Sequence, residues 1–171
     1  MDIFVVNGLP LHVLLVHVVV LLVPATALCV LLAAAWPTAR RRLGLLTPLM
    51  GLATIALVPL HTQSGQWLKD RVFGTPLIET HAALGTALWP WSLTLGLIGI
   101  ATWLWYFLSE RRTRSDDAGT ATRPTGGRRA VAISLAVLAF GIGGVATYQT
   151  VIIGESGSRA VWEGVVTESP R

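Results

Sequence analysis

The stretch Leu-Pro-Leu-His-Val-Leu-Leu-Val-His, residues 9–17, decides the fold, because it places two imidazoles at the start of a long apolar segment. No charged residue follows this stretch before Arg40. A histidine near hydrocarbon is costly unless it is paired or bound to a ligand. His12 and His17 therefore indicate a functional site at the mouth of a membrane helix.

The composition of the whole chain is that of an integral membrane protein. Of its 171 residues, 53% are hydrophobic and only 13% are charged, and the mean hydropathy is +0.63. The pI of about 10.2 does not indicate a nucleic-acid partner, because the net charge is only +4 and the basic residues cluster between apolar runs. The single cysteine, Cys29, has no thiol partner in the chain and is interpreted as a packing residue.

Four apolar runs are long enough to cross a hydrocarbon core, which takes about 20 residues of helix. They predict an all-α fold, an integral membrane four-helix bundle, with spans at about 10–36, 43–61, 81–108 and 129–154. Residues 155–171 are expected to form a polar C-terminal tail, and residues 64–72 a short surface helix.

The ends of two of these helices carry start signals. Pro10 suits the first turn of the first helix, and Asn7 or Gly8 is expected to cap it. Thr75 and Pro76 have the pattern of a cap and a first turn, so the third helix is expected to begin before residue 81.

The distribution of arginines predicts the orientation. Loops 37–42 and 109–128 are rich in arginine, whereas the loop between them has only Lys69 and Arg71. The positive-inside rule therefore places both arginine-rich loops in the cytoplasm and both termini outside the plasma membrane. Aromatic residues expected at the same inner side agree with this orientation: Trp36, Trp103, Trp105 and Tyr106.

With that orientation, all four histidines of the chain lie in the outer layer of the membrane. Small residues share one face with His81 (Gly85, Ser92, Gly96 and Gly99), with His61 (Gly44, Thr47, Gly51 and Thr54), and with Tyr148 (Ser134, Gly141 and Gly144). We therefore expect His61, His81 and Tyr148 to converge. His12 and His17 are about 140° apart around their helix and cannot both face inward; His17 is favoured because it lies deeper.

Three motifs carry a resemblance to a known family. They are Leu-Pro-Leu-His-x4-His, the His-Thr-Gln-Ser-Gly at residues 61–65 and the Glu-Thr-His-Ala-Ala-Leu-Gly at residues 79–85. Together they resemble a bacterial family of four-helix membrane proteins classified as a domain of unknown function, over about residues 8–154. The resemblance implies a layout similar to b-type cytochromes, an association with Rieske iron–sulfur proteins in some relatives, and a match at His12, His17 and His81. This chain has no Rieske motif, so an iron–sulfur partner would be a separate polypeptide.

Three functions remain open from the sequence. The first is a haem b held by two histidines, His17 or His61 together with His81, for electron transfer with a redox partner protein or quinol. The second is a copper or zinc site that uses three or four of the same imidazoles, namely His17, His61 and His81, with or without His12. The third is an accessory or structural membrane subunit without a cofactor. The sequence contains no catalytic motif, and the proposed cofactor-binding set is His12, His17, His61, His81 and Tyr148.

Overall fold

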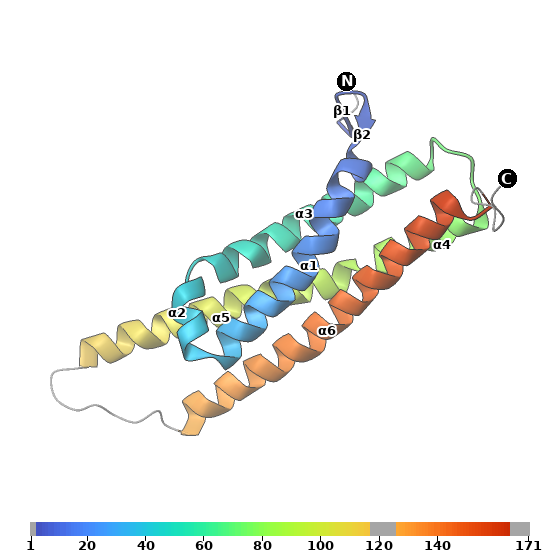
Figure 1. Cartoon of the computed structure of the whole chain (residues 1–171). Helices are drawn as coiled ribbons and strands as arrows, with labels where there is room; N and C mark the ends of the chain where they lie inside the picture. Colours follow the sequence, from blue (N-terminus) through green and yellow to red (C-terminus); the bar gives the residue numbers. More distant parts are fainter. Residues whose placement is uncertain (1–2, 117–125, 165–171) are drawn as a thin grey trace.

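The computed structural model describes residues 3–116 and 126–164, and most of these are helical (Figure 1). The helices are α1 (Leu11–Ala35), α2 (Pro37–Leu43), α3 (Leu46–Lys69), α4 (Pro76–Ala87), α5 (Trp89–Asp116) and α6 (Gly126–Trp162). A hairpin of two short strands, β1 (Val5–Val6) and β2 (Leu9–Pro10), precedes them. The middle of the predicted third loop and the last part of the predicted tail lie outside the described residues.

Three helical segments among the described residues have the length and apolar character needed to cross a membrane. They are Leu11–Ala35, Pro76–Arg111 and Gly126–Trp162. Helices α2 and α3 pass the same test as a pair, with a bend of 68° between them, which brings the number of candidate spans to four. The predicted multi-pass membrane character is compatible with this arrangement.

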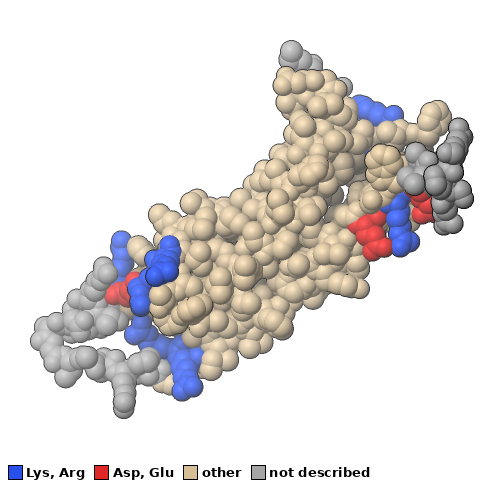
Figure 2. Space-filling view, in the orientation of Figure 1, with Lys and Arg blue, Asp and Glu red and all other residues tan. Residues whose placement is uncertain are grey.

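The distribution of apolar and charged side chains on the surface is also compatible with a multi-pass membrane protein. Large apolar side chains point outward along the helices, among them Leu21 at 71% exposure and Phe140 at 72%. Charged residues gather at the two ends of the molecule, and the visible face between them carries almost none (Figure 2). We name the ends the arginine end (Arg40, Arg41, Arg42, Arg111, Arg128 and Arg129) and the histidine end (His12, His61 and His81).

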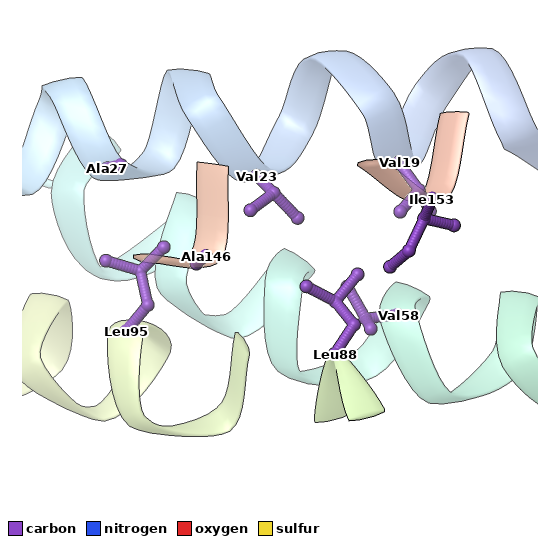
Figure 3. Packing of buried hydrophobic residues seen from close by; sticks show 8 residues of the cluster. All are labelled: Val19, Val23, Ala27, Val58, Leu88, Leu95, Ala146 and Ile153. Carbon is purple, nitrogen blue, oxygen red and sulfur yellow. The ribbon is translucent and has the colours of Figure 1, made fainter. Parts of the chain in front are cut away.

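Helix α1 occupies the centre of the arrangement because it packs against α3, α5 and α6. Helices α3 and α6 each pack against both α1 and α5 and lie on opposite sides of that pair (Figure 1). Eight buried residues from four helices and from the break between α4 and α5 fill the space between them (Figure 3): Val19, Val23, Ala27, Val58, Leu88, Leu95, Ala146 and Ile153. Small residues alternate with larger ones in this core, so the helices approach closely.

The closest approach is a crossing of α3 and α5 at two glycines. A Cβ atom added to Gly51 would lie 2.7 Å from the carbonyl oxygen of Gly96, and one added to Gly96 would lie 2.7 Å from that of Gly51. The small-residue faces predicted for the second and third spans are confirmed at Thr47, Thr54 and Ser92, which are also buried. They are not confirmed at Gly44 and Gly85, where an added Cβ would meet no other described helix within 4 Å. In lipid, faces of small residues let helix backbones meet.

The face predicted for the fourth span is wrong. Gly141 and Gly144 lie in open space, and the residues of α6 that are buried are Ala139, Gly143, Ala146, Thr150 and Ile153. These follow the same three-and-four spacing in a different register. Ala27 of α1 selects this register, because a Cβ on Gly143 would lie 2.9 Å from its side chain.

Side-chain hydroxyls and one thiol join the helices in the core. Thr26 Oγ1 of α1 lies 2.8 Å from Thr54 Oγ1 of α3, and Thr54 donates to the carbonyl of Met50 at 2.9 Å. Cys29 is buried and donates to Thr47 at 3.7 Å. The interpretation of Cys29 as a packing residue is thus confirmed.

The start of α1 differs from the prediction. Asn7 and Gly8 do not cap the helix; they form the turn of the hairpin, with φ of 51° and 78°. Asn-Gly is the preferred sequence for a two-residue turn that needs positive φ at both positions. The cap and first turn predicted at Thr75 and Pro76 are confirmed, because Thr75 accepts a hydrogen bond from the backbone N–H of Ile78 at 3.3 Å.

The first connection is helical rather than a loop. Pro37 begins α2, and Gly44 ends it with φ of 45°. Arg40 folds back so that its Nε donates to the carbonyl of Ala33 at 2.9 Å, and its guanidinium carbon lies 3.2 Å from the ring centre of Tyr106. This arginine satisfies a carbonyl that the end of α1 leaves without a helical partner.

Other helix ends also differ from the predicted spans. Helix α3 continues through residues 64–69 instead of ending at 61, so no separate surface helix forms there. Helix α6 continues to Trp162, so the first part of the predicted polar tail is helical. The predicted third span is divided at Leu88 into α4 and α5, because Pro90 lacks the N–H that would continue the helical hydrogen bonds.

We expect Gly51→Ala to destabilise the protein by about 1–3 kcal/mol, because its Cβ would overlap the backbone of α5. The measurement is thermal unfolding in detergent. Gly144→Ala is the matched control, since its Cβ meets nothing within 4 Å and alanine favours the helix. Equal losses of stability in both variants would contradict the crossing.

Candidate imidazole site

Three of the four histidines meet at the histidine end, each from a different helix. His12 of α1 and His61 of α3 are stacked, with ring centres 4.2 Å apart and planes at 17°. His81 of α4 meets His12 edge-on, with ring centres 6.1 Å apart and planes at 77°. We name His12, His61 and His81 the imidazole site.

His12 is held by a hydrogen bond to the backbone of the next helix. Its Nδ1 lies 3.2 Å from the carbonyl oxygen of His61, and Ser64 donates to the same oxygen at 2.8 Å. Because a carbonyl only accepts, Nδ1 carries the proton, and in the neutral ring Nε2 keeps its lone pair. Gly65 makes room for the contact, since a Cβ there would lie 2.8 Å from His12 Nδ1.

His81 is held in a similar way by α6. Its Nδ1 lies 3.0 Å from Ser156 Oγ, and the Ser156 hydroxyl donates to the carbonyl of Ile153 at 2.8 Å. The hydroxyl has a single proton, so it accepts from His81 Nδ1, and Nε2 again keeps its lone pair. Gly157 lies against the ring, because a Cβ there would lie 2.9 Å from His81 Cε1.

His61 differs from the other two histidines in the hydrogen bonding of its ring. Its Nε2 is buried, and it has no hydrogen-bond partner among the residues that the structure describes. A buried polar atom without a partner is costly and is rare in folded proteins. This nitrogen is thus a position at which a ligand would replace a missing interaction.

Polar contacts also join α3 to α4 next to the site. Gln66 donates to Thr86 Oγ1 at 3.2 Å, and Lys69 pairs with Glu79 at 2.6 Å. Gln66 and Lys69 follow His61 along α3, and Glu79 and Thr86 lie on either side of His81 along α4. The two contacts therefore join the same two helices that carry these histidines.

Two of the predicted site residues lie elsewhere. His17 is exposed on α1, so the preference for His17 over His12 as the inward-facing residue is wrong. Tyr148 is 66% exposed and lines a groove between α1 and α6, so its predicted convergence with His61 and His81 is wrong too. The cause is the register of α6, which turns Ala146 and Thr150 inward and Tyr148 outward.

The sequence analysis missed three residues of the site: Gly65, Ser156 and Gly157. Gly65 belongs to a motif that it quoted, but without a role. Ser156 and Gly157 fell outside the predicted fourth span, which ended at residue 154. The spacing from Ala146 through Thr150 and Ile153 to Gly157 repeats every three or four residues, and it is the signal that identifies them.

The described residues contain no group of three or more His, Cys, Asp or Glu side chains arranged to hold a metal ion. The site therefore does not have the form of a closed three-ligand metal centre. What it offers is a set of oriented imidazoles that come from separate helices.

Comparison with family models, with characterised proteins and with solved structures gives no match. The resemblance described above remains an expectation from the sequence motifs. The geometry of the imidazole site is consequently the main evidence on function.

We expect Ser156→Ala to release His81 from its single tautomer, because a neutral hydrogen bond contributes about 1 kcal/mol. The measurement is the ¹⁵N chemical shift of both ring nitrogens in histidine-labelled protein. Ser158→Ala is the control, since Ser158 is exposed two residues further along α6. An unchanged His81 spectrum in Ser156→Ala would contradict the hydrogen bond.

Proposed function

We propose that the chain is a four-span plasma-membrane protein that takes part in electron transfer. In this proposal the imidazole site binds haem b, in preference to a free copper or zinc ion. The observation that carries the proposal is the buried Nε2 of His61, which has no partner among the described residues. It lies beside two rings whose Nδ1 atoms are already hydrogen-bonded.

The hydrogen bonds at Nδ1 support a ligand role. Metal-binding histidines nearly always donate their second ring N–H to a carbonyl, a carboxylate or a similar group, which fixes the ring and leaves the other nitrogen for the metal. His12 donates to a carbonyl, and His81 donates to a hydroxyl that is itself bonded to a carbonyl. The imidazole site has this pattern at His12 and His81.

Ring geometry favours haem over a free ion. A free zinc or copper ion usually takes three or more protein ligands, and the described residues hold no such group. Haem iron needs only axial ligands from the protein, and histidine is a common one. Two imidazoles on one metal atom have ring centres about 6 Å apart, given bonds of about 2 Å, and His12 and His81 are 6.1 Å apart.

His12 and His61 are stacked face to face with ring centres 4.2 Å apart, so these two imidazoles would not hold the haem together. His81 with one member of the stacked pair is therefore the proposed ligand set, and the third imidazole lies beside it. When bound, the haem supplies a one-electron redox centre, and the protein residues fix its position and exclude solvent from the ligands.

The proposed topology places this centre on the outer side. The arginine end marks the cytoplasmic side by the positive-inside rule, with α1, α2 with α3, α4 with α5, and α6 as the four spans. Both termini then lie outside. A single centre at one face cannot carry electrons across the membrane, so the proposed role is a relay to a separate redox protein or a quinol.

A second function is favoured by one specific observation. The hydrogen bonds of His12 and His81 join α1 to α3 and α4 to α6, which is what a purely structural role for the imidazoles requires. In that case the chain is an accessory membrane subunit without a cofactor.

The experiment is an optical spectrum of the detergent-purified protein, oxidised and then reduced with dithionite, with iron, copper and zinc analysis of the same sample. Under the proposal, the reduced protein has a sharp α-band and stoichiometric iron. His81→Ala and His61→Ala are expected to lower the iron content roughly tenfold or more, as loss of a metal ligand or its orienting contacts does.

His17→Ala is the matched control, because it removes an exposed histidine of α1 and should leave the spectrum unchanged. Copper or zinc without the α-band would identify a free ion instead of haem. A protein from haem-replete cells with no band and no bound metal would leave only the accessory role. Helical circular dichroism of each variant distinguishes a lost ligand from a lost fold.

A further inference from the structure

A groove runs between α1 and α6 at the arginine end. It has a volume of about 500 Å³, and its lining includes Leu31 of α1 and Ile133 and Val137 of α6. Among the residues that the structure describes, Arg129 is the one charged residue that lines it. We name this feature the α1–α6 groove.

The length of the groove along the helix axis is close to the thickness of the hydrocarbon in one membrane leaflet. On α6 it extends from Arg129 to Phe140, which is about 16 Å at a rise of about 1.5 Å per residue. Half of the hydrocarbon core is about 15 Å thick. On the α1 side of the groove, the lining ends at Ala35, which is also the last residue of α1. The next residue, Trp36, is 58% exposed, and exposed tryptophans are typical of the membrane interface.

The arginine end of the molecule, at which the groove lies, carries a strong excess of positive charge. Among the described side chains, the arginine end has one acidic residue, Glu110, against six arginines. Anionic lipid head groups bind to basic sites between membrane helices on the cytoplasmic side. An apolar groove one leaflet deep that ends in an arginine therefore matches both parts of a phospholipid.

We infer that the α1–α6 groove binds one acyl chain of an anionic phospholipid, with the phosphate of its head group against Arg129. The inference rests on the membrane-spanning part of the proposed function and does not depend on a cofactor. Arg129 supplies the charge, the small residues Ala132 and Ala136 leave space for the chain, and the larger side chains contact it along its length.

The test is native mass spectrometry of the full chain in detergent with added phosphatidylglycerol or phosphatidylcholine. We expect phosphatidylglycerol to bind more tightly, and Arg129→Gln to weaken its binding about fivefold, since one arginine near an anionic lipid surface contributes about 1 kcal/mol. Ala136→Phe, which fills the groove, should also weaken it. Arg42→Gln is the control, because it removes the same charge from an exposed residue of α2 that does not line the groove.

Equal losses in Arg129→Gln and Arg42→Gln would overturn the inference, because binding would then follow the general charge of this end. Equal binding of the two lipids would overturn it as well. A dimer that Ala136→Phe converts to a monomer would show that a second copy of the chain covers the groove. His81→Ala should keep full lipid binding, so the loss of cofactor and the loss of lipid are separate outcomes.

Discussion

The backbone contact between Gly51 and Gly96 is the constraint on which the helix arrangement depends. Because neither residue has a side chain, α3 and α5 meet closely enough for α1 to pack against both. In a membrane, where lipid chains are as apolar as the core, such close packing and interhelical hydrogen bonds replace the hydrophobic effect as the source of association. The bond between Thr26 and Thr54 then joins α1 to α3 in the same region.

The sequence predicted the features that follow from apolar length and from local start signals. The long apolar runs predicted the helices, and the pattern at Thr75 and Pro76 predicted the start of α4. It did not predict the face of α6, because small residues occur on more than one side of that helix and only the contact with Ala27 selects between them. The end of α6 was missed because polar residues such as Ser156 look like a tail until their partner, His81, is known.

The sequence predicted which residue type forms the candidate site and at which level of the membrane it lies. It did not predict which histidine side chains point toward the other helices. Two histidines five residues apart on α1 point in different directions, and depth alone favoured His17. Whether one of them turns inward depends on a partner from another helix, here the carbonyl of His61 and the open space beside Gly65. Neither is visible in the periodicity of α1 itself. Contacts between helices decided the facing, as they also decided the register of α6.

Helix α4 carries His81 but has no buried residue of its own. Segments with few buried contacts open more readily than the core and exchange their amide hydrogens sooner. The helix is separated from α3 by the connection before Thr75 and from α5 by the interruption at Leu88. The imidazole of His81 is thus carried by a helix without a buried residue, and its position depends on polar contacts that α4 makes with α3 and α6.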